Sequence, residues 1–270
     1  MELHVNTPAG AAPAWAYTGG KAFDAALPCI VFVHGALNDH SVWTLLARWF
    51  AHHGRSVLAV DLSGHGRSGG LPLASIEAAA DWLLAALDAA GVQRAALVGH
   101  SMGSLIALEA AARAPARAST LAMLGTAYPM KVSDLLLTTS RDDPLRAIEM
   151  VNTFSHSGFA AKPSYPGPGT WLHGADRALM RRVQAGQMAV NLFHHDFSVC
   201  NAYAGGTAAA AKVACATHLI VGARDQMTTP KQAREIAAAL KATVHTVPAG
   251  HALMAEAPDA VLAALRVALG

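Results

Sequence analysis

The chain has 270 residues, of which 53% are hydrophobic and only 14% are charged, and its formal net charge is +2. This length and apolar content allow a large buried core, in one α/β domain or in two smaller domains. Lysines and arginines are dispersed along the chain, so the basic patch of a nucleic-acid-binding protein is missing. No apolar run reaches the roughly 18 residues that a membrane-spanning helix needs. We therefore expect a small-molecule substrate, with neither nucleic acid nor a membrane as a partner.

Residues 1–8 contain neither the basic nor the apolar stretch of a secretion signal, and this predicts a cytoplasmic protein. The cysteines Cys29, Cys200 and Cys215 are an odd, widely spaced set without a Cys-x-x-Cys pair. Such a set is typical of reduced thiols rather than of a disulfide framework or a zinc site. The sequence leaves the oligomeric state open, a homodimer included.

Strand and helix patterns alternate from the N-terminus. Residues 2–18 predict two short antiparallel strands at a sheet edge, because a Pro-Ala-Gly turn divides them. After them, β-branched runs predict buried strands, and apolar side chains at helical spacing predict helices. The expected elements are strands at 29–33 and 57–61 and helices at 41–53 and 75–90, the last with Ser75 as its N-cap.

The next predicted strand leads into Gly99-His100-Ser101-Met102-Gly103, and a helix rich in small residues is predicted over 102–113. Strand, sharp turn and helix around Gly-x-Ser-x-Gly are typical of a nucleophile elbow. Side chains at positions 99 and 103 would collide with neighbouring backbone, so glycine is required at both. We predict that Ser101 projects its hydroxyl from the C-terminal edge of a sheet.

A strand predicted at 119–124 ends the first run of alternation, which resumes near Gly206. We interpret residues 129–205 as an inserted cap, and residues 1–128 with 206–270 as the core domain. After the insertion, the pattern predicts strands at 218–222 and 243–247 and helices at 230–240 and 256–269. Repeated alternation implies an α/β fold with a mostly parallel sheet and helices on both faces.

A serine nucleophile needs a histidine base and a carboxylate that orients the base. Asp225 follows the strand predicted at 218–222, and His251 follows the last predicted strand. The loop after the strand at 119–124 contains no acid, which favours Asp225. Active sites of such folds lie at the C-terminal ends of the strands. We therefore predict Ser101, Asp225 and His251 as the catalytic residues.

Acyl transfer also needs backbone N–H groups that hold an oxyanion. We predict that Ala36 and Met102 supply them, with Leu37 as the rival of Ala36. Loop neighbours and aromatic side chains of the insertion are candidates for substrate contact: His34, Leu37, His100, Trp171 and Phe193. Packing inside the insertion is the alternative for four of its side chains, Trp171, Met188, Phe193 and Phe197.

Other polar groups have structural interpretations. We expect Asp61 and Arg67 to hold the loop at 63–70 by hydrogen bonds. The histidines and the acid of the insertion match no zinc spacing, and neighbours on a helix point in different directions. These are His173, His194, His195 and Asp196. We expect no metal and no cofactor.

The chain resembles the α/β-hydrolase superfamily in four places. These are His34-Gly35, Asp61-Leu62-Ser63-Gly64-His65-Gly66-Arg67-Ser68, the Ser101 pentad and Gly250-His251. The resemblance covers almost the whole chain outside the insertion. The chain is similar in particular to small capped carboxylesterases and meta-cleavage product hydrolases. It implies an α/β-hydrolase fold and cofactor-free acyl chemistry through a serine ester. Epoxide hydrolases and haloalkane dehalogenases use an aspartate in place of Ser101, which makes those activities a poor match.

The leading interpretation is hydrolysis of a carboxylic ester of a small, largely apolar substrate through an acyl-enzyme. Cleavage of a carbon–carbon bond is an alternative, and the carboxylate of such a substrate would need a cation such as Arg177, Arg181 or Arg182. An acyltransferase would use the same acyl-enzyme. The loop at 38–40 faintly resembles that of cofactor-free dioxygenases of this fold. A ligand receptor built on a hydrolase fold is the non-enzyme alternative.

Overall fold

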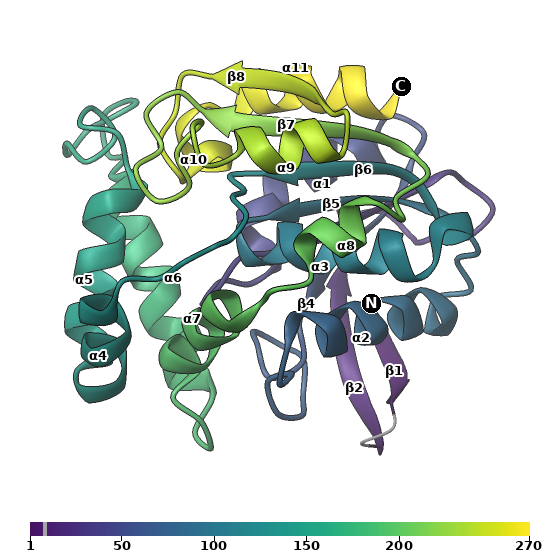
Figure 1. The fold of residues 1–270 in the computed structure, drawn as a ribbon, viewed down its shortest axis with the longest axis horizontal. Helices are drawn as coiled ribbons and strands as arrows, with labels where there is room; N and C mark the ends of the chain where they lie inside the picture. The colour runs from purple at the N-terminus through teal and green to yellow at the C-terminus, as the bar shows by residue number, and fades with distance from the viewer. Residues whose placement is uncertain (8–9) are drawn as a thin grey trace.

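The computed structural model describes residues 1–7 and 10–270 and contains an eight-stranded sheet of order β1-β2-β4-β3-β5-β6-β7-β8 (Figure 1). The strands β3 to β8 are parallel, whereas β2 is antiparallel to both β1 and β4. The strands are β1 (Glu2–Thr7), β2 (Gly10–Tyr17), β3 (Cys29–Val33), β4 (Ser56–Asp61), β5 (Ala95–His100), β6 (Ala118–Leu124), β7 (Ala216–Gly222) and β8 (Thr243–Val247).

Helices cover both faces of this sheet (Figure 1). One face carries α1 (Thr44–Ala51) and α11 (Pro258–Leu269), and the other carries α2 (Ile76–Ala89), α3 (Met102–Arg113) and α9 (Arg234–Ala239). The remaining helices are η1 (His40–Trp43), η2 (Pro115–Arg117), α4 (Asp134–Asp142), α5 (Pro144–Ser155), α6 (Leu172–Gly186), α7 (Leu192–Ala202), α8 (Gly206–Ala210) and α10 (Leu253–Glu256).

The central strand β3 explains why two hydrophobic cores form. Its side chains alternate between the two faces of the sheet, as the geometry of a strand requires. Val31 and Val33 pack into the core under α2 and α3, and Ile30 and Phe32 pack into the core under α1 and α11. All are buried. A run without polar residues is therefore what a strand covered on both faces needs.

The predicted strands are all present, and so is the α2 helix, whose N-cap Ser75 accepts a hydrogen bond from the Ala78 N–H at 3.1 Å. Three predicted helices differ from the structure. The helix expected over 41–53 begins as the 3-10 turn η1, and the one expected over 230–240 begins only at α9. The helix expected over 256–269 is divided between α10 and α11. The residue before Pro258 is biased away from helical backbone, so the first helix ends there and α11 starts at the proline.

Five helices, α4 to α8, lie between β6 and β7 in the sequence, and we call the first four, α4 to α7, the inserted helices. In Figure 1 they stand together at one side of the molecule, next to the edge where the parallel strands end. In the part of the chain that the structure describes, no helix is long and apolar enough to cross a membrane. The three cysteines are free.

Candidate active site

Ser101 lies in the sharp turn between β5 and α3, with backbone angles φ +52° and ψ −121°. Such a conformation is strained for a residue with a side chain and occurs where the surrounding structure imposes it. A Cβ on Gly99 would meet the carbonyl oxygen of Gly103, and a Cβ on Gly103 would meet that of Val33. The steric reason for both glycines is thereby confirmed. The Ser101 N–H donates to the Leu124 carbonyl at 2.9 Å, which ties the turn to β6.

Asp225 and His251 meet beyond the ends of β7 and β8. His251 Nδ1 lies 2.8 Å from Asp225 Oδ2, in a hydrogen bond between two buried side chains. The Thr228 hydroxyl donates to the same carboxylate oxygen at 2.8 Å. The other oxygen, Oδ1, accepts the N–H groups of Met227 and Thr228 at 2.8 and 2.9 Å. The carboxylate is thus fixed on both sides and holds the imidazole in one orientation.

The charges of this pair favour each other. Burial lowers the pKa of His251, but the Asp225 carboxylate raises it by more. The net result is a pKa above the usual 6.5. Burial raises the pKa of Asp225, but the nearby His251 and the hydrogen bonds that the Asp225 carboxylate accepts lower it by more, so this pKa lies below 3.8. His100 behaves differently, because burial, with His251 as a second cause, lowers its pKa to about 3. His251 is therefore the histidine of this site that is suited to carry a proton.

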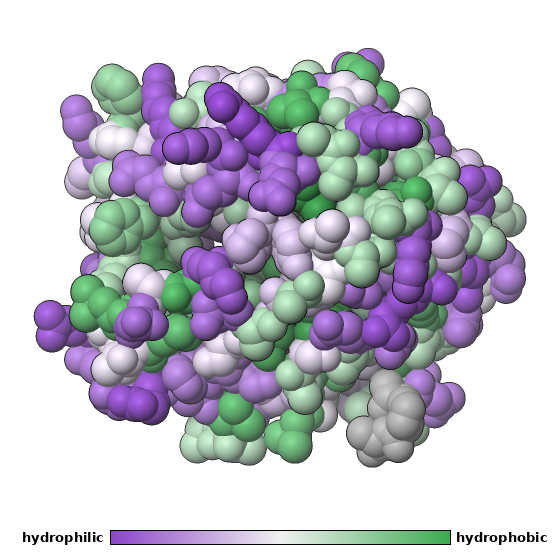
Figure 2. All heavy atoms as spheres, in the orientation of Figure 1, coloured by the Kyte–Doolittle hydropathy of each residue, from purple (hydrophilic) through white to green (hydrophobic). Residues whose placement is uncertain are grey.

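Two cavities meet at Ser101, one of about 470 Å³ and one of about 240 Å³. The side chains and backbone common to both are those of Ala36, Ser101, Val151, Phe197, Met227 and His251. Figure 2 shows a hollow between the inserted helices and the rest of the molecule, with hydrophobic side chains on its left and hydrophilic ones above and below it. The predicted nucleophile and base thus face a junction of two spaces.

Within residues 1–7 and 10–270, the Ser101 hydroxyl makes no hydrogen bond, to His251 or to any other group. Contacts of this kind are often long in structures without substrate and tighten when substrate binds. The Ala36 N–H likewise has no protein acceptor among the described residues, and Ala36 lines both cavities. Met102 is the first residue of α3, so helical bonding leaves its N–H free. The rival donor Leu37 gives its N–H to Asp196 Oδ2 at 2.8 Å.

Three of the predicted substrate contacts lie elsewhere. His34 is fully buried, and its ring nitrogens lie 2.8 Å from the Gly35 carbonyl and 3.1 Å from the Leu62 N–H. Leu37 is also fully buried, in the core under α2 and α3. Phe193 is enclosed behind Phe197, with the two rings stacked at 4.6 Å between centroids. His34 holds the backbone after β4 through its bond to Leu62, and Leu37 and Phe193 fill the core.

Of the two other predicted substrate contacts, His100 and Trp171, only one reaches the larger cavity. His100 lines it. Trp171 does not line it, since its ring stacks on His173 and its Nε1–H donates to the Ala161 carbonyl at 3.1 Å. Met188 is 92% exposed and contributes no cavity wall. The sequence left open whether four side chains pack the insertion or line a pocket. Of these four, Phe197 is the one that lines both cavities.

Asp176 on α6 is a site residue that the sequence analysis missed. It lines the larger cavity together with Ser101 and His251, and its neighbours on the helix, Leu172 and Leu179, line the same space. Burial raises the pKa of Asp176, although nearby histidines, His251 among them, oppose this. A carboxylate between leucines on one helix face is the sequence signal that could have identified it.

The three arginines considered for a substrate carboxylate each have an acidic partner. Arg177 and Arg181 pair with Glu149 at 3.5 and 2.8 Å, and Arg182 pairs with Asp39 at 2.7 Å. Only Arg182 lines the larger cavity. The cavity therefore holds a carboxylate without an ion-pair partner in the described chain, Asp176, and a cation that is already paired.

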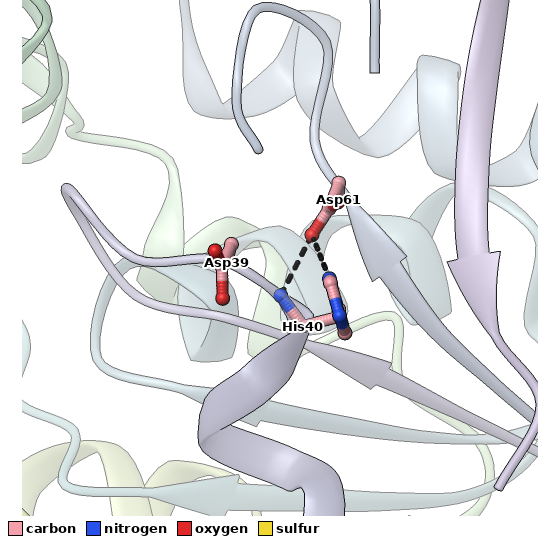
Figure 3. Close-up of side chains that lie close together, drawn as sticks. All are labelled: Asp39, His40 and Asp61. Atoms are coloured by element: carbon pink, nitrogen blue, oxygen red, sulfur yellow. Dashed lines mark hydrogen bonds and ion pairs between the residues drawn. The ribbon is translucent and has the colours of Figure 1, made fainter. Parts of the chain in front are cut away.

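The loop after β4 is held as predicted. Asp61 Oδ2 accepts the Arg67 N–H at 2.9 Å, and Asp61 Oδ1 accepts from the backbone and ring nitrogens of His40 at 2.7 and 2.8 Å (Figure 3). The Arg67 guanidinium instead lies over the Trp15 ring at 4.2 Å. Both carboxylate oxygens of Asp61 therefore accept hydrogen bonds that hold the loops.

Among the described residues, one trio places three metal-ligating atoms within reach of one another: Asp39, His40 and Asp61 (Figure 3). Internal hydrogen bonds already occupy these atoms, since His40 Nδ1 faces Asp61 and Asp39 bonds Ser41 and Arg182. The histidines considered above for the insertion have different neighbours. His194 Nδ1 lies 3.0 Å from the Ser140 hydroxyl, whereas His173 stacks on Trp171.

Comparisons with known proteins agree with this architecture. The chain is 41% identical over 93 residues to the sn-1-specific diacylglycerol lipase of Mus musculus, a match that covers 34% of this chain and 30% of the lipase. The first curated relatives are matched over only 26 to 36% of their own length. An enol-lactonase from Burkholderia xenovorans LB400 superposes with a TM-score of 0.79 at 22% identity and 96% coverage of both chains.

A thermophilic esterase from Thermogutta terrifontis superposes with a TM-score of 0.80 at 19% identity, covering 99% of this chain and 96% of the esterase. At such identities the likeness concerns the fold. The sequence model of the alpha/beta hydrolase family matches residues 30–264, which is far more than half of the chain. The protein belongs to the alpha/beta hydrolase family.

Proposed function

We propose that this hydrolase cleaves the carboxylic ester of a small, largely apolar substrate through a serine acyl-enzyme. The observation that carries the proposal is the position of Ser101 and His251 at the junction of two cavities, with His251 bonded to Asp225 at 2.8 Å. An ester has an acyl part and an alcohol part on either side of the reacting carbonyl. A junction of two apolar spaces accommodates one part in each.

In the proposed reaction, Ser101 Oγ attacks the carbonyl carbon while His251 Nε2 takes the hydroxyl proton. Asp225 keeps the Nδ1–H of His251 directed at its own carboxylate and stabilises the imidazolium. The Ala36 and Met102 N–H groups hold the oxyanion. His251 then gives the proton to the leaving alcohol, and a water molecule activated by the same histidine releases the acid. Residues 129–205, the proposed cap, exclude other water from this chemistry.

A panel of 4-nitrophenyl esters with acyl chains of increasing length tests the proposal. The purified protein is expected to release 4-nitrophenol with saturation kinetics, and such turnover distinguishes an enzyme from a receptor on the same fold. Absence of turnover across the panel, with the protein folded, would count against ester hydrolysis. Adding a primary alcohol as competing acceptor separates hydrolysis from acyl transfer, because a transferase would form the new ester in preference to the free acid.

The pH dependence of kcat/KM is expected to follow the deprotonation of His251. Only neutral imidazole can accept the serine proton, so activity should rise with pH. The pKa of His251 is raised from 6.5, chiefly because Asp225 outweighs burial. The apparent pKa of the acid limb should therefore lie above about 6.5. A pH profile measured with a neutral ester checks this, and a flat profile between pH 5 and 9 would contradict the role of His251.

Phe197 is expected to determine acyl-chain preference, because it lines both cavities at Ser101. Phe197→Ala should change the ratio of kcat/KM between short and long acyl esters by roughly 10-fold. Trp171→Ala is the control, since this ring lies outside the cavity wall. Phe193→Ala should instead lower the melting temperature with little change in the ratio. Equal losses for every ester in Phe197→Ala would assign this ring to packing alone.

Asp176 argues against an anionic substrate and thus against carbon–carbon bond cleavage, whose substrate carries a carboxylate. A second negative charge near Asp176 would be repelled in this partly buried space. For Asp176→Asn, we expect kcat/KM for the 4-nitrophenyl hemiester of glutarate to rise roughly 10-fold relative to that for 4-nitrophenyl butyrate at pH 8. An unchanged ratio would mean that the acid does not face the acyl group.

A further inference from the structure

An acid of the inserted helices reaches the loop that carries the proposed oxyanion donor. Asp196 on α7 is 2% exposed, and its Oδ2 accepts the Leu37 N–H at 2.8 Å and a bond from His65 Nε2 at 2.9 Å. Leu37 follows β3, and His65 lies in the loop after β4. One carboxylate oxygen therefore joins an inserted helix to two loops at the C-terminal edge of the sheet.

The backbone of Leu37 explains why this contact has consequences. Leu37 has φ +54°, a left-handed conformation that a leucine adopts only when its surroundings impose it. Its side chain is fully buried, and a buried N–H without an acceptor loses the hydrogen bond that it would make to water in the unfolded chain. Asp196 supplies that acceptor. The orientation of the peptide that precedes Leu37, and hence of Ala36, depends on this bond.

The contact favours the charged forms of both side chains. Burial lowers the pKa of His65, but Asp196 opposes it, and the pKa of His65 is raised from 6.5. Burial raises the pKa of Asp196, but His65 and the Leu37 N–H outweigh it, so the pKa of Asp196 is lowered from 3.8. The other ring nitrogen of His65 lies 3.1 Å from the Ser63 carbonyl. Hydrogen bonds to an ionised acceptor are roughly twice as strong as neutral ones.

We propose that Asp196 is a positioning residue that holds the Ala36 N–H in place for the oxyanion, so that the oxyanion site is complete only when α7 is docked on the sheet domain. This inference rests on the proposed ester hydrolysis. It gives the insertion a part in the chemical step besides substrate choice. Asp196 itself does not line either of the two cavities at Ser101, so its effect on catalysis passes through the loop.

The test compares Asp196→Leu, Asp196→Asn and the control Tyr203→Phe. Tyr203 also makes a buried hydrogen bond at the end of α7, to Glu109 at 2.8 Å, but none of its hydrogen bonds among the described residues reaches residues 34–37. Loss of one oxyanion donor costs roughly 10²–10³ in kcat, so a misplaced donor in Asp196→Leu should cost about 10- to 100-fold in kcat with KM within about threefold. With its amide oxygen in the place of Oδ2, asparagine can accept from both the Leu37 N–H and His65 Nε2–H, and should restore most of kcat.

Hydrogen exchange of a peptide containing Leu37, followed by mass spectrometry, supplies a readout that needs no turnover. Exchange should accelerate in Asp196→Leu and stay slow in the Asn variant and the control. Should the leucine variant not fold, Asp196→Ser carries the same expectations, because its hydroxyl is too short to reach Leu37. A kcat near that of the wild type in the folded Leu or Ser variant, or an equal loss in Tyr203→Phe, would overturn the inference. Absence of wild-type turnover would instead reject the proposed function.

Discussion

Replacing Ser101 by alanine is expected to lower kcat for 4-nitrophenyl esters by roughly 10⁶-fold, the order of loss seen when a serine nucleophile is removed from a triad. A residual rate above that of water should remain, since substrate binding and the oxyanion donors are untouched. The fold should not change, because the Ser101 hydroxyl makes no hydrogen bond in the described part of the chain.

Ester turnover and the melting temperature of Ser101→Ala are measured together. Ser75→Ala is the matched control, because it removes a serine hydroxyl that caps α2 and that lines neither of the two cavities at Ser101. The control should lose about 0.5–2 kcal/mol of stability and keep its kcat. Activity of Ser101→Ala within tenfold of the wild type would contradict the role of Ser101 as nucleophile.

Asp225→Asn is expected to lower kcat by roughly 10⁴-fold, the cost of the same change in a serine protease. Asn can still accept the Met227 and Thr228 N–H groups with its oxygen, which leaves its NH₂ group facing His251 Nδ1. Nδ1 must then be the acceptor, so Nε2 carries the proton and cannot take another from Ser101. We expect the loop structure to survive in this variant, while His251 adopts the tautomer that cannot accept the serine proton.

Asp61→Asn is the control for this change. Both carboxylate oxygens of Asp61 accept N–H donors from His40 and Arg67, so an amide there should lower the melting temperature while kcat stays within a few fold. If Asp61→Asn lost activity selectively and Asp225→Asn did not, the acid would be misassigned. Steady-state kinetics and circular dichroism of both variants distinguish these outcomes.

The centre of the sheet could be predicted from the sequence because the strands β3, β4 and β5 are buried on both faces. A run such as Cys29–Val33 has no polar residue, and this leaves little choice of structure. The glycines around Ser101 were informative for a similar reason, since backbone approaches both of them closely. The division of the last helix was missed, although Pro258 marks it.

The substrate cavity could not be predicted in the same way. Phe193 and Phe197 are both aromatic and lie on the same helix, yet one is fully enclosed and the other lines the cavities. Helical spacing defines the face of a helix but not which neighbour fills it. The carboxylate of Asp196 likewise meets Leu37 only through the tertiary fold, and no local pattern relates an acid on α7 to a loop after β3.

The most direct test of the account is mass spectrometry of the protein after treatment with a fluorophosphonate. We predict one phosphonyl group per chain, attached to the peptide that contains Ser101, with loss of ester turnover in proportion to labelling. The Ser101→Ala variant should remain unlabelled under the same conditions. Labelling of a different residue, or full ester turnover by a protein whose Ser101 is completely modified, would contradict the acyl-enzyme mechanism.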